Sequence, residues 1–212
     1  ILLNETPWVM EAKNETERKQ RLATLFDLND LKQKSDVWVK KLADYRLADG
    51  GYAWFKGCDY SSLHTSLFVV DNIGRLRKAG LDTKDVEKSL NVKATLHYLD
   101  GRLREEYDNM KKWKLTPHCS SSTLYYFQVR SLFPDVSLKQ GTKEAYDYYF
   151  KLMAEKDEWE SFSLYEKSLA AIALHRGGKS EVAKKIVESL REHSSTTDEM
   201  GMYWKKNTSG WL

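Results

Sequence analysis

Apolar residues recur along the chain at the spacing of one helix face. Four sets of such residues lie three, four or seven positions apart: Leu31, Trp38, Leu42 and Tyr45; Val92, Leu96, Leu99 and Leu103; Ala145, Tyr149 and Leu152; Val182, Ile186 and Leu190. Lys and Glu crowd the positions between them. This pattern predicts amphipathic helices that bury one face and expose the other.

Helices of a second kind alternate with the amphipathic ones. The stretches 63–76, 121–133 and 164–175 carry apolar residues over most of their circumference, which predicts burial on nearly every side. No strand-like alternation persists in the sequence. We therefore predict an all-α protein, with at least half of its residues in helix, built from stacked hairpins with these helices: 15–27, 30–46, 62–79, 83–108, 120–132, 142–156, 163–176 and 179–193.

An aromatic loop precedes each of the predicted buried helices. The aromatic residues are Tyr52, Trp54 and Phe55 in the first loop, Trp113 in the second, and Trp159 and Phe162 in the third. A fourth aromatic stretch, 200–212, is expected to lead into another buried helix. A recurrence of roughly 45–60 residues is typical of repeated supersecondary units. We expect Trp54 to be a buried wedge between two hairpins.

This alternation suits an α/α toroid of the terpenoid cyclase/prenyltransferase kind, in which inner helices form a barrel wall and outer helices face solvent. Four hairpins make an incomplete ring, so residues 1–212 are expected to form a single, partial toroid domain. The chain begins with Ile1 and ends in SGWL, which favours a piece of a longer protein. The edges around Leu22, Leu25 and Phe26 and around Tyr203, Trp204 and Trp211 are then expected to expose apolar surface and to allow self-association.

Composition excludes some partners. The 34 basic residues nearly balance the 31 acidic ones, so no nucleic-acid stripe or polybasic membrane patch is expected. No window reaches the roughly 18 consecutive apolar residues of a membrane span. The composition, 41% hydrophobic and 31% charged, is that of a folded, soluble protein.

Few residues offer reactive chemistry. Cys58 and Cys119 match no metal-ligand spacing; unpaired core thiols are the favoured interpretation, and a disulfide stays open. His118 and Cys119 form the one close pair of soft ligands, but PHCSSS is better explained as a helix start with Ser120 or Ser121 as its cap. We assign no metal and no cofactor.

Toroidal enzymes would need converging acids or a Tyr/His pair at the barrel mouth. No acidic cluster of the terpenoid cyclase kind occurs. Four acidic residues could line a mouth: Asp59, Asp71, Glu158 and Glu160. With so many acidic residues in the chain, this signal is weak. The isolated His64, His97, His175 and His193 are interpreted as packing or solvent positions, and no catalytic residue is assigned.

Four longer stretches resemble a known family. LLNETPWVMEAKNETERKQRLATLFDLN (2–29), DGGYAWFKG (49–57), GRLRKAG (74–80) and MGMYWKKNTSGW (200–211) are similar to the alpha-2-macroglobulin family, above all to its large bacterial members of the Bacteroidetes type. The resemblance implies part of the thioester-type toroid domain, set between macroglobulin-type β-sandwich domains. It also implies a non-enzymatic endopeptidase inhibitor that traps proteases in the periplasm or at the cell surface.

Family members that keep the thioester carry a Gly-Cys-X-Glu-Gln pattern. Here Gly57 and Cys58 are followed by Asp59, Tyr60 and Ser61, so a hydroxyl stands where the glutamine must supply the acyl carbon. Cys58 is therefore expected to be an ordinary thiol. Two alternatives stay open: a carbohydrate-active toroid (glycosidase or lyase), marked by acids at the mouth, and a helical-repeat interaction module, marked by a concave face with one sign of charge.

Overall fold

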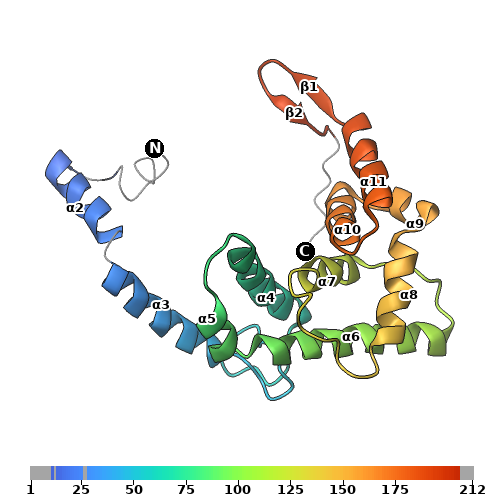
Figure 1. The fold of residues 1–212 in the computed structure, drawn as a ribbon, viewed down its shortest axis with the longest axis horizontal. Coiled ribbons are helices and arrows are strands. Elements are labelled where there is room, and N and C mark those ends of the chain that lie inside the picture. The colour runs from blue at the N-terminus through green and yellow to red at the C-terminus, as the bar shows by residue number, and fades with distance from the viewer. Residues whose placement is uncertain (1–10, 12, 26–27, 206–212) are drawn as a thin grey trace. The chain divides into compact units, whose positions relative to one another are not determined.

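The computed structural model describes residues 11, 13–25 and 28–205. The chain divides into two compact units, Ile1–Tyr45 and Arg46–Leu212. Ten helices and one two-stranded hairpin make up the regular structure of these described ranges, so the predicted all-α character is confirmed (Figure 1). Within the same ranges, no helix combines the length and the apolar character that crossing a bilayer requires.

The first unit contains helices α2 (Glu15–Leu25) and α3 (Leu28–Ala43). The Asn14 side chain accepts a hydrogen bond from the backbone N–H of Glu17 at the start of α2. Trp38 belongs to one of the predicted apolar stripes, but its side chain is exposed, with Lys41 Nζ 4.4 Å from the ring centre. Leu22 is half-buried; Phe26 lies outside the described residues, as does the side chain of Leu25.

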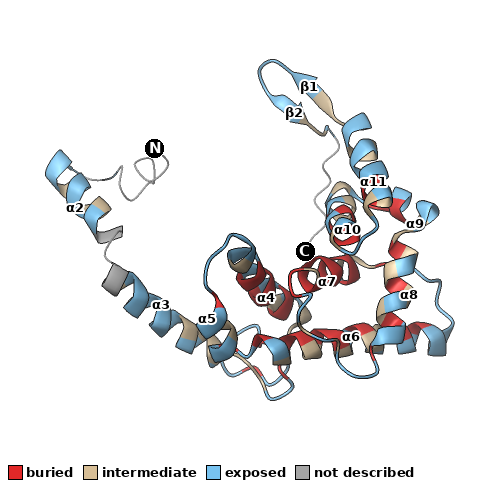
Figure 2. Cartoon of the chain, viewed as in Figure 1, coloured by how far each residue is buried: buried red, intermediate tan, exposed pale blue. Residues whose placement is uncertain are grey.

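The second unit has a central row of three helices: α4 (Leu63–Lys78), α7 (Ser121–Arg130) and α10 (Leu164–Arg176). Helix α7 contacts α4 on one side and α10 on the other. Eight consecutive residues of α7, from Thr123 to Arg130, are buried (Figure 2). The prediction of helices buried on nearly every side is confirmed most fully for α7, whereas α4 exposes Phe68 and Leu76, and α10 exposes Tyr165 and Ile172.

A second set of helices covers this row: α6 (Val92–Trp113), α8 (Lys143–Met153) and α11 (Ser180–Glu192). Helix α6 packs against α4, α7 and α8, and α11 packs against α10. Two short helices, α5 (Lys84–Ser89) and α9 (Lys156–Ser161), precede α6 and α10. Buried and half-exposed helices thus alternate along the chain, as their sequence patterns predict.

The prediction of one helix over 83–108 is wrong. Asn91 adopts a left-handed backbone conformation (φ 47°) between α5 and α6, and its side chain caps α6 by accepting from the backbone N–H of Ala94. Asn tolerates this conformation better than most residues do. Helix α6 then continues to Trp113, so Trp113 ends a helix instead of lying in a loop.

The C-terminal part of the unit forms strands β1 (Ser195–Thr197) and β2 (Gly201–Tyr203), which pair in antiparallel fashion. This hairpin was not predicted. Trp204 is half-buried, and its indole N–H donates to the Leu190 carbonyl of α11 at 2.7 Å. The expectation of an exposed apolar edge at Tyr203 and Trp204 is therefore met only partly, and Trp211 lies outside the described residues.

Candidate functional site

The loop 46–62, which contains the DGGYAWFKG stretch, has a tightly bonded base. Tyr52 is buried, its backbone N–H donates to Ser66 Oγ at 2.8 Å, and its hydroxyl donates to the Leu90 carbonyl at 3.2 Å. The carboxylate of Asp49 accepts from Gly51 N–H and from the Ser61 hydroxyl. These bonds tie the base of the loop to the start of α4 and to the α5–α6 junction.

The two glycines of the loop are required by close packing. Gly50 has φ +93°, and a Cβ atom built there would lie 2.6 Å from the Ala94 carbonyl oxygen. A Cβ atom on Gly51 would lie 2.5 Å from Ser61 Cβ. Any larger residue would separate the loop from α6 or strain its backbone. The glycine pair therefore explains how the loop reaches so close to its neighbours.

The tip of the same loop is exposed. The side chain of Trp54 is 65% accessible, and Phe55 and Tyr60 are also exposed. The prediction that Trp54 is a buried wedge is wrong, because the buried aromatic residue of this loop is Tyr52. Trp113 is exposed as well, whereas Trp159, in α9, is buried as expected.

Both cysteines are free and buried. Cys58 lies within the loop, where its thiol contacts the Tyr60 carbonyl at 3.5 Å. Cys119 contacts the Tyr149 carbonyl, and burial, together with Glu158 and Glu106, raises the pKa of its thiol. A raised pKa means fewer thiolates and low nucleophilicity at neutral pH. The favoured prediction of unpaired core thiols is confirmed.

A buried ion pair joins α6 to α7. Asp100 is fully buried, and its Oδ1 accepts from Arg130 Nε at 3.2 Å and from the Tyr126 hydroxyl at 2.7 Å. Its Oδ2 accepts from the backbone N–H of Lys139 at 2.8 Å. Arg130 also donates to the carbonyls of Phe133 and Val136. Every oxygen of this carboxylate has a donor, so the cluster fixes the 131–139 segment and is structural.

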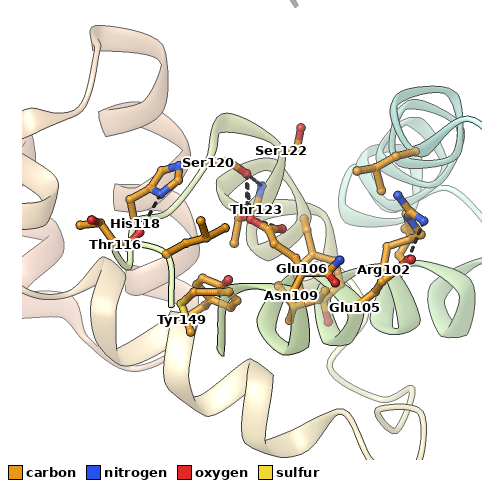
Figure 3. Close-up of a pocket in the computed structure, with 16 residues that line it drawn as sticks. Arg102, Glu105, Glu106, Asn109, Thr116, His118, Ser120, Ser122, Thr123 and Tyr149 are labelled. Atoms are coloured by element: carbon orange, nitrogen blue, oxygen red, sulfur yellow. Dashed lines mark hydrogen bonds and ion pairs between the residues drawn. The ribbon is translucent and has the colours of Figure 1, made fainter. Parts of the chain in front are cut away.

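A polar pocket lies along the middle of α6. It measures about 430 Å³ and is bounded by α6, the 115–120 segment, the start of α7 and Tyr149 of α8 (Figure 3). This volume falls within the range of ordinary small-molecule sites. Carboxylates, hydroxyls, an imidazole and a tyrosine line this cavity together.

Glu106 is the central polar group of this pocket. Both of its carboxylate oxygens accept from the Thr123 hydroxyl at 2.9 Å, and one accepts from the Ser120 hydroxyl at 3.4 Å. Ser120 caps α7, as one of the two alternatives predicted, by accepting from the backbone N–H of Thr123. The carboxylate thus lies at the N-terminus of α7, where a negative charge is favourable.

Tyr149 lies across the pocket from Ser120 and Thr123 (Figure 3). Its side chain is 1% accessible. Burial raises the pKa of its hydroxyl, and the nearby carboxylate of Glu106 raises it further. The sequence pattern placed Tyr149 on a buried helix face but did not show that its hydroxyl lines a pocket. Helical spacing is the same for a tyrosine that only packs in the core and for one that also lines a pocket.

The four acids proposed for a barrel mouth are not joined by any contact among the described residues. Glu158 accepts from the backbone N–H of Cys119, and Glu160 pairs with Lys156 at 3.5 Å. Asp59 is exposed. Asp71 is buried in α4 and is held by Arg75, Tyr125 and Gln128. Each acid therefore has a separate local environment.

The histidines have local partners of the kind predicted. His97 lies 3.3 Å from the Ser137 carbonyl, and His193 lies 2.7 Å from the Ser189 carbonyl. His175 contacts Ser180, and His64 packs near the ring of Tyr125. His118 is exposed and contacts the Thr116 carbonyl at the rim of the pocket. Among the described residues no three His, Cys, Asp or Glu side chains are grouped in a way that could hold a metal ion.

Comparisons of the chain with protein-family models, curated proteins and solved structures found no match.

Proposed function

We propose that this chain is a non-enzymatic helical segment of a bacterial alpha-2-macroglobulin-like protein, an endopeptidase inhibitor of the cell envelope. In this proposal α4, α7 and α10 are inner helices and α6, α8 and α11 are outer helices of an incomplete α/α toroid. The parent protein would trap proteases at the periplasmic or cell-surface side, and this segment would contribute structure and contacts to that machine.

The observation that carries the proposal is the build of the loop 46–62. DGGYAWFKG is one of the stretches in which the chain resembles the family, and its residues divide into two groups. Asp49, Gly50, Gly51 and Tyr52 lock the base onto α4 and α6 through hydrogen bonds and close packing. The locked base presents an exposed aromatic tip.

Such a tip is suited to contact with another domain. Trp54 and Phe55 are large apolar residues whose exposure costs solvation free energy that burial against a partner would recover. In a protein built from a toroid and β-sandwich domains, the partner would be a neighbouring macroglobulin-type domain of the same chain. The aromatic tip would then transmit movements of that domain to the helical segment.

A trapping assay on the complete gene product tests the proposal. Trypsin incubated with an excess of that product should keep its activity on a small chromogenic peptide and lose most of its activity on a large protein substrate. A trapped protease shows this difference because small substrates still reach its active site. If the product leaves the activity of trypsin on the large protein substrate unchanged, the proposal is refuted.

A paired variant connects the assay to this segment. Trp54→Ser with Phe55→Ser in the complete product should weaken trapping, because the tip would lose its contact surface. Lys56→Ser, at the same tip, is the matched control and should leave trapping unchanged. If the product traps proteases but neither variant matters, the role given to the tip is wrong.

A further inference from the structure

The pocket along α6 contains an acid without a basic partner. Two glutamates, one arginine and one histidine line it. Arg102 is already paired, since it lies 2.6 Å from Glu105, and His118 contacts the Thr116 carbonyl at the rim. Glu106 is half-buried and, within the described part of the chain, accepts hydrogen bonds only from the hydroxyls of Ser120 and Thr123. No Lys, Arg or His of the described chain lies within ion-pair distance of it. The pocket therefore carries one negative charge that the protein does not balance.

A second polar group in the pocket lacks a partner. The hydroxyl of Tyr149 makes no hydrogen bond within the described parts of the chain, although the side chain is almost fully buried. Its hydroxyl oxygen is not fully enclosed by the described residues, so in the unbound protein it meets the solvent that fills the pocket. Since Tyr149 lines the pocket, a molecule bound there can supply the partner.

The remaining lining is largely aliphatic. Leu99, Leu103 and Met110 of α6 are buried beside the polar groups, and Leu63 and Leu115 complete this surface. A ligand that satisfies the two polar groups would therefore lay an apolar body against leucine and methionine side chains. Binding sites commonly combine a small number of polar groups with an apolar lining in this way.

We propose that this pocket binds a small alkylammonium ion. The ammonium group has three N–H donors and no acceptor, which matches the carboxylate of Glu106, the hydroxyl oxygen of Tyr149 and the side-chain oxygen of Asn109 at the pocket wall. Its positive charge balances Glu106, and its alkyl chain covers Leu99, Leu103 and Met110. An anion would be repelled by Glu106, and a neutral alcohol would leave the charge unbalanced.

The probe is n-pentylamine, compared with 1-pentanol and pentanoate at the same concentrations. Titration of the 212-residue chain, followed by backbone amide chemical shifts, should show saturable binding of pentylamine with shifts in α6 and at the start of α7. The alcohol should bind at least about 10-fold more weakly, because it lacks the charge-assisted hydrogen bond. Equal affinities for amine and alcohol, or no saturable binding of the amine, would overturn the proposal.

Two variants locate the site. Glu106→Gln should weaken pentylamine binding at least about 10-fold, and Tyr149→Phe should weaken it about 3- to 10-fold. Asp108→Asn is the matched control: the same charge is removed from an exposed position of α6 that does not line the pocket, where it is paired with Arg104 at 2.8 Å, and binding should change less than about 2-fold.

Glu106 also supports the start of α7, so Glu106→Gln could perturb the fold. Tyr149→Phe avoids this difficulty, since the lost hydroxyl has no partner in the unbound protein, and its melting temperature should match that of the parent. A Tyr149→Phe protein with the parent's melting temperature and weakened amine binding supports the proposal. The same protein with unchanged amine affinity refutes the role of Tyr149 and, with it, the site.

Discussion

Helix α6 carries two inward carboxylates, Asp100 and Glu106, and each has a tyrosine from another helix nearby. Asp100 receives hydrogen bonds from Arg130, the Tyr126 hydroxyl and a backbone N–H, and it is fully buried. Glu106 is half-buried and receives hydrogen bonds from two hydroxyls, while the Tyr149 hydroxyl beside it has no partner among the described residues. The protein supplies donors, one of them charged, to both oxygens of the Asp100 carboxylate, whereas the Glu106 carboxylate can still accept a hydrogen bond from a bound cation.

This difference separates a structural polar cluster from a candidate site. A buried charge whose partners are all supplied by the protein has nothing left to offer a ligand, and removing one partner leaves another buried and unpaired. A carboxylate that meets only neutral donors at a pocket can still gain from a cation. The two clusters lie on one helix, so they can be compared by matched substitutions.

The largest effect is expected at the saturated carboxylate. Asp100→Asn leaves the buried guanidinium of Arg130 without a negative partner, which should lower the free energy of unfolding by about 3–5 kcal/mol. Urea denaturation followed by circular dichroism measures the change. Glu105→Gln, which breaks the exposed pair with Arg102, should change the free energy of unfolding by less than about 0.5 kcal/mol.

A loss below about 1 kcal/mol for Asp100→Asn would contradict this account. It would mean that Arg130 is satisfied by the Phe133 and Val136 carbonyls alone. The cluster would then be a loop clamp that does not depend on charge, and the contrast with Glu106 would lose its basis.

A smaller effect should distinguish the two tyrosines. Tyr126→Phe removes a donor from a buried carboxylate and should lower the free energy of unfolding by about 1–3 kcal/mol. Tyr149→Phe removes an unpartnered hydroxyl and should change it by less than about 0.5 kcal/mol. Both variants keep the ring, so packing is conserved. Equal losses in the two variants would show that Tyr149 has a structural partner.

The sequence predicted the helices far better than these polar clusters. Helical spacing depends on near neighbours, and the apolar residues Leu96, Leu99 and Leu103 of α6 are buried where the pattern predicts. Asp100 and Arg130 lie thirty positions apart, and only tertiary packing brings them together. Glu106 and Tyr149 are also far apart in the sequence and are brought together only by tertiary packing. No local sequence motif therefore predicts the pocket.

The misplaced helix break has a different cause. The stretch around Asn91 keeps apolar residues at helical spacing on both sides, so periodicity alone predicts one long helix over 83–108. The left-handed conformation of Asn91 interrupts it, and a single Asn between Leu90 and Val92 is a weak signal of such a break. Hydrophobic periodicity is judged over a window of many residues, so it does not detect a change of backbone conformation at a single residue.

The loop 46–62 shows a similar contrast, between the buried Tyr52 at its base and the exposed Trp54 at its tip. Substitution of Trp54 is expected to have the smallest effect on stability. Because Trp54 is exposed, Trp54→Ala should change the free energy of unfolding by less than about 0.5 kcal/mol. The same substitution of a buried tryptophan would lower the free energy of unfolding by about 3–5 kcal/mol. Trp159→Ala is the matched control, since the same side chain is removed from a buried position, and it should cost about 3–5 kcal/mol. Thermal and urea denaturation of the two variants measure both values. A loss at Trp54 as large as that at Trp159 would mean that the tip is covered in solution, and the loop would then be a packing element from base to tip.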